Sequence, residues 1–541
     1  MKKRIISLAL ILSMVLTLFV GCGKKEQALL TEDGKVILRV GIPQNANVTD
    51  YENNSFTKYL EESLNIKIKF VFFSSNSTEY KTQLALMCSA NETLPDVMTG
   101  FHHLGRYTVN AYGQDGYFLD LTDLIEEYGT NYKEQLAKWD KDYQEYIVER
   151  GTDAETGGFY GMPYASILLP DNIHTLMYIN QEWLKAVNKE MPTTLDEFYA
   201  VLKAFKEQDP NGNGKADEIP MVSKAGVSRG IETYIINAFV YYDTRDPYNV
   251  TNGKVWAPYT SNEYRDSLIY LNKLCKEGLF SDLCFTAKGN NELKTLITPT
   301  NNVAKVGVWC GHPSIMSNVK TTILDQYVAL PCLEGVTDKG GYTTVMREDV
   351  YYSAYITKDC ANVEVAMKFL DFFYNDETVT RARHGEKGVD WVEEKGIGEL
   401  GHESSIKVLN DNAFFGGSST WCLNGASFVN EDNYIAVATE GTGRQAESSR
   451  LIRETYELVK NAKQPKELAQ NLTYNAEEYD IREEYYGQLE AYVHEQRVLF
   501  IMGEKNPSSD SDWNNYLSTL EKLGQSKLLD VAQSAYERSS K

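Results

Sequence analysis

The chain has 541 residues, 42% of them hydrophobic, and a net charge of −22 at pH 7. This length exceeds what one hydrophobic core usually supports, so two or three domains are expected. The negative charge argues against nucleic acid and anionic lipid surfaces as partners, because both are polyanions.

The first 22 residues predict export. MKKR is a positively charged start, and the apolar run that follows is shorter than the ~20 residues that span a bilayer. Phe19-Val20-Gly21-Cys22 is similar to a bacterial lipobox, although Phe19 replaces the usual Leu; an ordinary secretory signal with a chance cysteine is the alternative. We expect a lipoprotein signal peptide over residues 1–22, with Cys22 acylated, for example by palmitate, and a flexible tether over 23–35.

The other cysteines show no metal-binding or redox spacing. They are odd in number and form no CxxC motif, and we expect buried, inert thiols in a reducing or anaerobic habitat; they are Cys88, Cys275, Cys284, Cys310, Cys332, Cys360 and Cys422.

After the tether, strand and helix patterns alternate. Strands are predicted at 36–44 and 66–73, and helices at 53–65 and 79–90, before a break at 93–100. This order is typical of an α/β sheet, in which loops that follow the strand ends often carry the ligand.

A second α/β region begins near residue 176. Thr194 and Glu197 are spaced as a capping box for a helix that ends near Gln208. A strand is predicted at 302–313, then a strand and helix pair at 350–376, and the C-terminal third is strongly helical.

Residues 209–220, DPNGNGKADEIP, have the pattern of a calcium loop. Side-chain oxygens of three residues, a backbone carbonyl and two carboxylates would make up the six ligands that Ca²⁺ accepts, and Gly214 allows the sharp turn; these ligands are Asp209, Asn211, Asn213, Lys215, Asp217 and Glu218. Pro220 stands where a helix–loop–helix calcium hand has a bidentate Glu, so a metal-free Asn-Gly turn is the alternative. Mg²⁺ suits the loop less well, because it prefers a rigid octahedron.

Several segments together resemble a known family. LALMCSANETLPDVMTG (84–100), YGQDGYFLDLTDLIEEYG (112–129), YGMPY (160–164) and residues 177–221 follow one another in a specific order. They resemble the extracellular solute-binding lipoproteins of carbohydrate ABC importers, of the family 1 type found in Gram-positive bacteria. The resemblance covers essentially the whole mature chain.

The resemblance implies an α/β, periplasmic-binding-protein-like fold with two lobes joined by hinge strands around a ligand. Lobe I would comprise 36–166 and 300–375, and lobe II 167–299 and 376–541. Relatives bind a structural Ca²⁺ with carboxylates at the ninth and tenth loop places, here Asp217 and Glu218. The protein would be a monomer on the extracellular face of the membrane, binding an oligosaccharide and the importer's permease subunits.

The ligand site should offer aromatic platforms for sugar rings and polar groups for their hydroxyls. Phe101, His102 and His103 follow Pro95-Asp96, where similar proteins contact sugar; a plain surface loop or a metal site are alternatives. Four further aromatic residues each have a packing or hinge role as the alternative; they are Tyr164, Trp309, Trp391 and Trp421.

The resemblance implies a receptor that breaks no bond. One alternative is an extracellular glycan-cleaving enzyme, for which 76 acidic residues make chance carboxylate pairs unavoidable. No Gly-framed nucleophilic Ser, HExxH or phosphate loop appears in the sequence. The other alternative is a receptor for a different solute, such as a peptide.

Overall fold

The computed structural model describes most of the mature chain. Cys22, the signal peptide and the start of the tether lie outside the described residues. No helix within the described part is long and apolar enough to cross a membrane. The structure describes residues 29–153, 155–166, 176–223, 230–244, 247–286, 290–299, 301, 303–313, 323–342, 349–397, 403–410, 413, 417–422, 425–429, 437–438, 445–459, 462–463, 465–469 and 472–539.

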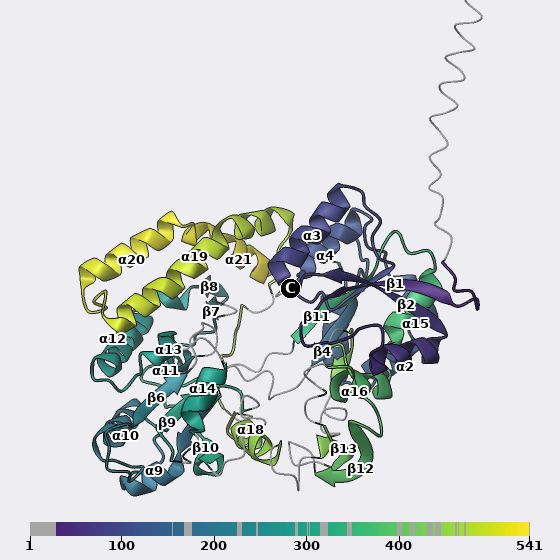
Figure 1. The fold of residues 1–541 in the computed structure, drawn as a ribbon. Helices are drawn as coiled ribbons and strands as arrows, with labels where there is room; N and C mark the ends of the chain where they lie inside the picture. Colours follow the sequence, from purple (N-terminus) through teal and green to yellow (C-terminus); the bar gives the residue numbers. More distant parts are fainter. Residues whose placement is uncertain are drawn as a thin grey trace, which may run out of the picture. The chain divides into compact units, whose positions relative to one another are not determined.

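The chain divides into two compact units (Figure 1). The first contains Met1–Ala165, Val350–Asp390 and Asn410–Phe428, and the second contains the remaining segments. The return to the first lobe was predicted at residue 300, whereas the chain enters the first unit again at Val350. The reason is that the strand predicted at 302–313 pairs within the second unit's sheet.

The first unit is built on a six-stranded mixed sheet. Its central strand β3 pairs in parallel with β1 and antiparallel with β11. β1 buries Leu38, Val40 and Ile42 completely or nearly so, because alternate apolar side chains face the core. The strand order is β14 (Phe428–Val429), β4 (Met162–Ser166), β11 (Asp349–Ile356), β3 (Val97–Thr99), β1 (Val36–Pro43) and β2 (Ile66–Phe73).

Five helices of the first unit, α2, α3, α7, α15 and α16, begin at side chains that cap them. The Asn54 side chain accepts a hydrogen bond from the backbone of Phe56, and Asn76 does the same for the next helix. Such caps satisfy N–H groups that a helix start leaves without partners. The helices are α2 (Ser55–Leu64), α3 (Ser77–Ser89), α4 (Arg106–Gln114), α5 (Thr122–Tyr128), α6 (Thr130–Leu136), α7 (Lys141–Gly151), α15 (Val363–Phe372) and α16 (Asp376–His384).

The second unit has its own four-stranded sheet and a large apolar core. Every residue of β9 is buried, since β5 and β6 pair with its two edges. The predicted capping box of Thr194 and Glu197 is present and begins α10. The strand order is β10 (Tyr327–Ala329), β5 (Met177–Asn180), β9 (Val306–Cys310) and β6 (Ile219–Ser223), and helices of this part are α9 (Gln181–Ala186), α10 (Leu195–Glu207), α11 (Ile231–Phe239), α14 (Asn290–Ile297) and α18 (Gln445–Val459).

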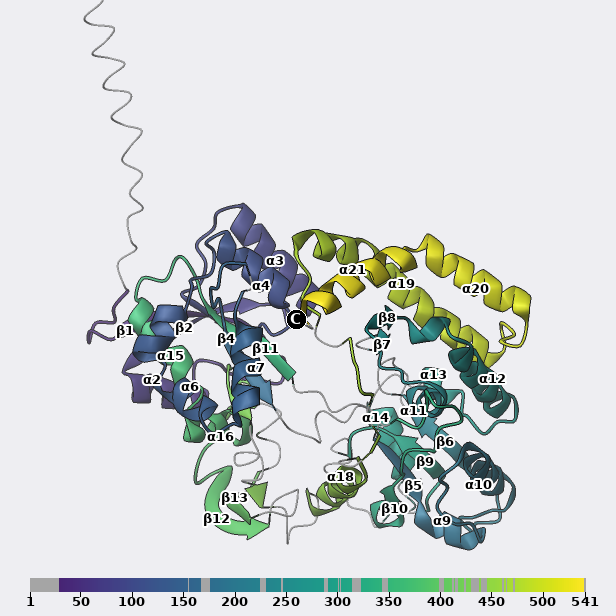
Figure 2. The ribbon, with the colours of Figure 1, turned by 180° about the vertical axis from the view of Figure 1, so that it is seen from behind.

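The C-terminal segment is helical, as predicted. Three helices pack on one another, and the longest also packs on α12 (Asn262–Lys276) (Figures 1 and 2). Two small sheets complete the unit: β7 (Asn249–Thr251) with β8 (Lys254–Trp256), and β12 (Trp391–Ile397) with β13 (Glu403–Val408) and β15 (Val437–Ala438). The α/β class is therefore confirmed; the C-terminal helices are α19 (Ala476–Met502), α20 (Asp510–Lys522) and α21 (Gln525–Ser539).

Candidate functional site

A pocket of about 90 Å³ lies in the first unit. It forms where the loop after β3 meets the start of α4, the end of α7 and the strands β4 and β11. Neighbouring strands of one sheet thus bring together residues far apart in the sequence. The described residues that line the pocket are His102, Gly105, Arg106, Arg150, Gly151, Pro163, Val350, Tyr351 and Tyr352.

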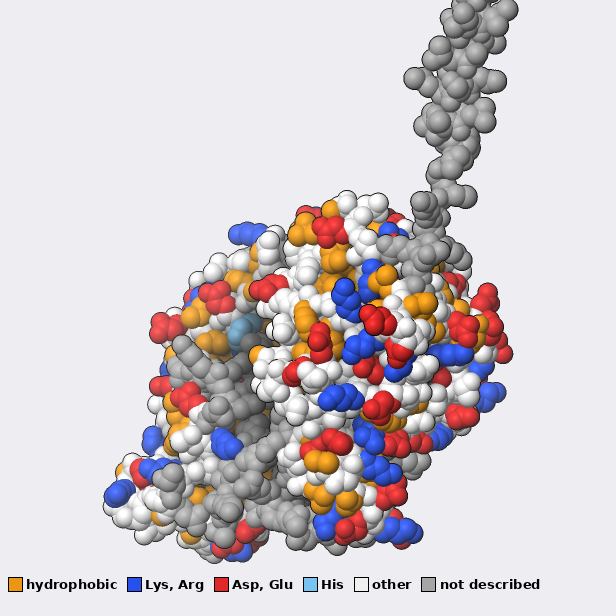
Figure 3. Space-filling model, turned by 45° about the vertical axis from the view of Figure 1, so that its right-hand side comes forward, with side chains coloured by type: hydrophobic (Ala, Val, Ile, Leu, Met, Phe, Trp, Pro, Cys, Tyr) orange, Lys and Arg blue, Asp and Glu red, His pale blue; other side chains and the backbone are white. Residues whose placement is uncertain are grey.

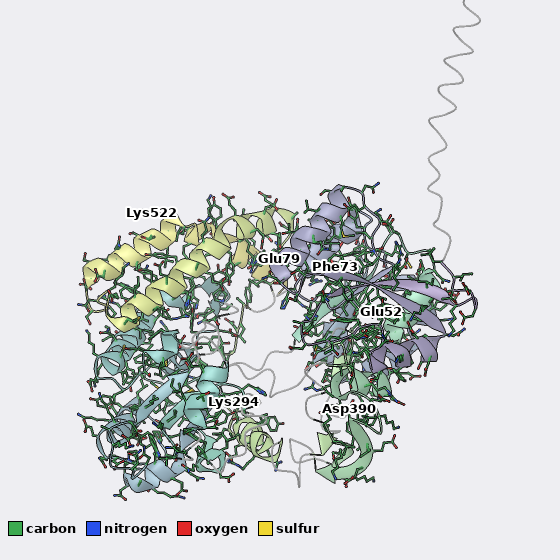
Figure 4. The ribbon with its side chains drawn as sticks, viewed as in Figure 1. Glu52, Phe73, Glu79, Lys294, Asp390 and Lys522 are labelled. Atoms are coloured by element: carbon green, nitrogen blue, oxygen red, sulfur yellow. The ribbon has the colours of Figure 1, made fainter. Side chains whose placement is uncertain are left out.

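Phe101 anchors the loop after β3. Its side chain is fully buried and packs edge-on against Phe73, at the end of β2 (Figure 4), with ring centroids 4.9 Å apart. Tyr80 of α3 packs against it from a second direction, at 5.1 Å. The structure therefore gives Phe101 a packing position, and the two following histidines are the loop residues nearer the surface.

His102 is a neutral hydrogen-bonding group on the pocket wall. Burial, with a smaller contribution from His103, lowers the pKa of His102 to about 4. Its ring lies 5.5 Å from the ring of Tyr351. The neighbouring His103 is exposed, and its backbone N–H donates to the Tyr80 hydroxyl at 3.1 Å. A neutral imidazole offers one donor and one acceptor, as sugar hydroxyls do.

Tyr164 and Tyr351 form an aromatic platform. Tyr164 of β4 stacks on Tyr351 of the neighbouring strand β11, with centroids 4.9 Å apart and planes inclined by 17°. Both rings are partly exposed. Tyr164 was among the ligand residues predicted from the sequence, whereas Tyr351 was not. Strand alternation in VYYSAYI was the available signal, since it puts Tyr351 and Tyr352 on opposite faces.

Two arginines reach the pocket from separate helices. Arg106 begins α4, and its Nη2 donates to the carbonyl oxygen of Glu149 at 2.9 Å and to that of Thr152. It thereby satisfies carbonyl groups at the end of α7. Arg150 lies in the last turn of α7, where burial is the main cause that lowers its pKa. No pattern in the sequence identified these residues.

The three predicted tryptophans lie in cores. Trp309 is fully buried on β9, with its ring 4.4 Å from that of Tyr178. Trp421 is buried in the first unit, and its Nε1 donates to Thr57 Oγ1 at 2.8 Å. Trp391 is buried at the start of β12. Each tryptophan therefore has the packing position that was the alternative. Of the predicted ligand residues, Tyr164 belongs to the aromatic platform and His102 lies beside it.

The loop between α10 and β6 turns its side-chain oxygens onto its own backbone. Asp209 Oδ2 accepts from the N–H of Gly214 at 2.9 Å, and Asn213 Oδ1 accepts from that of Lys215 at 2.8 Å. The φ angles of Asp209, Gly212 and Gly214 are 47°, 67° and 74°. These left-handed positions favour Gly and explain the two glycines of the loop.

The acidic groups of this loop fit a hard cation. Asp217 Oδ2 lies 2.9 Å from the Nζ of Lys305. Hydrogen bonds from Asn213 and from this lysine lower the pKa of Asp217 to about 2. Glu218 Oε1 is buried and has no hydrogen-bond partner among the described residues. Burial raises the pKa of Glu218, as do the charges of Asp209 and Asp217. A cation would relieve this repulsion.

Among the described residues, histidine, cysteine and carboxylate side chains alone make no metal cluster. Nowhere in the described ranges do three or more of them form a group that could hold an ion. The 209–220 loop would therefore need its amide and carbonyl oxygens as ligands too, which is usual for Ca²⁺. The same finding gives the metal alternative for His102 and His103 no support.

Residues 45–274 match the family of bacterial extracellular solute-binding proteins. The predicted resemblance is confirmed. The chain is 25% identical to the fructooligosaccharide ABC transporter substrate-binding protein FusA of Streptococcus pneumoniae, over 95% of this chain and 98% of the relative. It is 28% identical to Lipoprotein LipO of Bacillus subtilis over 52% of this chain, and spans about half of that relative (51%).

Solved structures share the fold. An extracellular solute-binding protein from Bifidobacterium longum subsp. infantis has a TM-score of 0.75 and 22% identity, with 95% of this chain and all of that chain covered. An EF-hand mutant of FusA in complex with fructo-nystose has a TM-score of 0.73 and 21% identity, covering 93% and 99% of the two chains. Both likenesses extend over nearly the whole chain and concern the fold alone.

Proposed function

We propose that the protein is a monomeric, lipid-anchored receptor that captures an oligosaccharide and delivers it to an ABC importer, without catalysis. The observation that carries this proposal is the Tyr164–Tyr351 platform beside the neutral imidazole of His102. The C–H face of a sugar ring packs on such a platform, while the imidazole and guanidinium groups hydrogen-bond to its hydroxyls. The names of the relatives, which include a fructooligosaccharide-binding protein, support a sugar ligand.

The loop at 209–220 is proposed to hold a structural Ca²⁺. Its ligands would be side-chain oxygens of five residues and the Lys215 carbonyl, and the buried oxygen of Glu218 supports this reading. A relative with a named EF-hand, FusA, supports the choice of ion. The five side chains belong to Asp209, Asn211, Asn213, Asp217 and Glu218.

Anchoring is proposed to occur through Cys22 on the extracellular face of a Gram-positive cell membrane. The lipobox-like sequence and the lipoprotein relative LipO support it. The permease subunits of the importer would then meet the receptor at the membrane surface.

Binding to a glycan panel tests the receptor function. A cognate oligosaccharide should raise the melting temperature of the purified protein, because a ligand that binds only the folded state stabilises it. Tyr351→Ala should weaken the affinity of the protein for that oligosaccharide roughly tenfold in calorimetry, since stacking contributes about 1 kcal/mol or more. Tyr128→Ala, a change on α5 away from the pocket, should leave affinity unchanged.

The outcomes separate the alternatives. No melting shift with any glycan, together with a shift from a peptide panel, would transfer the receptor function to another solute. Turnover of a bound glycan by the purified protein would contradict the non-catalytic assignment.

A further inference from the structure

Lys305 brings a positive charge to the 209–220 loop from outside the loop. Its Nζ lies 2.9 Å from Asp217 Oδ2, and the two side chains are only 34% and 28% exposed. Ion pairs also occur on the surface of this acidic protein, and Figure 3 shows acidic and basic side chains interspersed over one face. A pair such as Lys203 with Glu207, in which both side chains are at least half exposed, contributes little to stability. The pair of Lys305 with Asp217 is screened less, because water reaches less of it.

The sheet of the second unit holds Lys305 beside the loop. The backbone N–H of Ile219 donates to the carbonyl oxygen of Lys305 at 2.7 Å, and Ile219 itself pairs with Val306. Asp217 lies two residues before Ile219, so the backbone that carries the lysine runs along the end of the loop. The pairing of β6 with β9 therefore fixes the lysine at the loop, although it lies far away in the sequence.

Both carboxylate oxygens of Asp217 have donors in the structure. Lys305 contacts Oδ2, while Oδ1 accepts from Asn213 Nδ2 at 2.9 Å and from Asn211 Nδ2 at 3.4 Å. A cation that binds this carboxylate has to share it with these donors or replace one of them. Of the donors, only the lysine carries a charge that opposes a cation.

The ammonium group of Lys305 has two opposite effects on a cation in the loop. It orients the Asp217 side chain, which saves part of the entropy that a ligand loses when it is fixed. It also repels the cation, because both positive charges act on one carboxylate group. The repulsion doubles for a divalent ion, whereas the gain from orienting one short side chain is small. Repulsion should therefore dominate, and the lysine should weaken the binding of Ca²⁺.

We propose that Lys305 is a competitor of Ca²⁺ built into the fold, which lowers the calcium affinity of the loop and stabilises the loop when the ion is scarce. The inference rests on the proposed calcium loop and adds the residue that sets its affinity. The lysine serves Asp217, while Glu218 Oε1 has no hydrogen-bond partner among the described residues. Ca²⁺ therefore still gains a ligand that the lysine does not satisfy.

Lys305→Met tests the proposal, because methionine keeps most of the apolar stem and removes the charge. Calorimetric titration of the chelator-treated, dialysed protein with calcium chloride should give a Kd about tenfold lower than that of the unchanged protein. Lys305→Arg keeps the charge, and its Kd should stay within about twofold of that of the unchanged protein. The exposed Lys189→Met of the same unit is the control for net charge and should also stay within about twofold.

Melting curves supply a second measurement. In chelator, Lys305→Met should melt at a lower temperature than the unchanged protein, because Asp217 loses the charge that compensates its own. In saturating Ca²⁺ the difference should shrink, since the ion then supplies this charge. Should Lys305→Met fail to fold, Lys305→Gln replaces it with the same expectation, because glutamine still donates to Asp217 but carries no charge.

The results separate the role of the lysine from the calcium site itself. A folded variant without the charge that binds Ca²⁺ no more tightly than the unchanged protein overturns the role of Lys305 and leaves the calcium loop intact. If calcium chloride binds to neither protein and shifts neither melting curve, the calcium loop falls, and the inference falls with it. The receptor function for sugars does not depend on either outcome.

Discussion

At the scale of single residues, His102 links the first-unit pocket to the stability of the folded protein. Its pKa is lowered from 6.5 to about 4 in the folded unit. Between these values the unfolded chain binds a proton that the folded chain does not, so acid favours unfolding. The free energy of unfolding should therefore fall as the pH is lowered from about 6.5 to about 4, by up to about 1.4 kcal/mol per pH unit from this group, and this contribution should then level off.

Denaturant unfolding of the unchanged protein and of His102→Gln, measured across this pH range, isolates the contribution. Groups common to both proteins cancel in the difference between their curves. The difference should change with pH between about 6.5 and about 4 and be constant above about pH 7. Parallel curves throughout would show that His102 titrates normally in the folded unit.

Some residues of the first-unit pocket could be predicted from the sequence, and others could not. His102 and Tyr164 could be predicted, because the loop after a strand and the YGMPY segment have recognisable positions. Trp309 and Trp421 could not be assigned, since a tryptophan in a core and one in a binding site look alike in a sequence. Arg150 could not be predicted as a pocket residue, because it reaches the pocket only through the folding of the end of α7 beside the start of α4.

At the scale of elements, the loop between α10 and β6 should couple calcium to stability. Saturating Ca²⁺ at about one hundred times its dissociation constant should add about 2.7 kcal/mol to the free energy of unfolding, because only the folded loop gathers the ligands. Chelator should reverse the gain without abolishing ligand binding at low temperature. The melting temperature with and without Ca²⁺ measures the effect.

Glu218→Gln should remove most of the calcium-dependent shift, since it deletes one carboxylate charge from the site. Without Ca²⁺ the same change should be neutral or stabilising, because burial and neighbouring acids raise the pKa of Glu218. The exposed Glu190→Gln is the control and should retain the full shift. A shift that survives in Glu218→Gln would remove this residue from the ligand set.

The conformation of the 209–220 loop could be predicted in part from the spacing of its residues. The oxygens of Asp209, Asn211 and Asn213 recur at every second position, so the inward turn could be predicted. The contact of Asp217 with Lys305 could not, because the lysine lies before β9, far along the chain. The parallel pairing of β6 with β9 brings Lys305 to Asp217.

At the scale of the whole molecule, strand and helix alternation predicted the α/β class but not the path of the chain. The strand at 306–310 has the apolar pattern of a buried strand in either unit, and pattern alone cannot assign its partners. Its pairing with β5 and β6 places it in the second unit, so the return occurs at Val350. The small sheet of β12, β13 and β15 was not predicted either.

The proposed membrane attachment also belongs to the scale of the whole chain. Its net charge of −22 disfavours adsorption to anionic lipid. In the proposed attachment, acyl chains at Cys22 supply the anchoring free energy, and one chain alone gives only weak, reversible binding. Metabolic labelling with palmitate should therefore mark the unchanged protein and leave Cys22→Ser unlabelled.

Replacing residues 1–22 by a cleavable secretory signal without a lipobox should release the body into the medium. Fractionation of cells and medium measures this, and the folded body should keep its glycan affinity because the first-unit pocket lies far along the chain from Cys22. Retention of that protein on the membrane would show that a surface other than the acylated cysteine holds it. Palmitate incorporation into Cys22→Ser would instead place the acyl group on another residue.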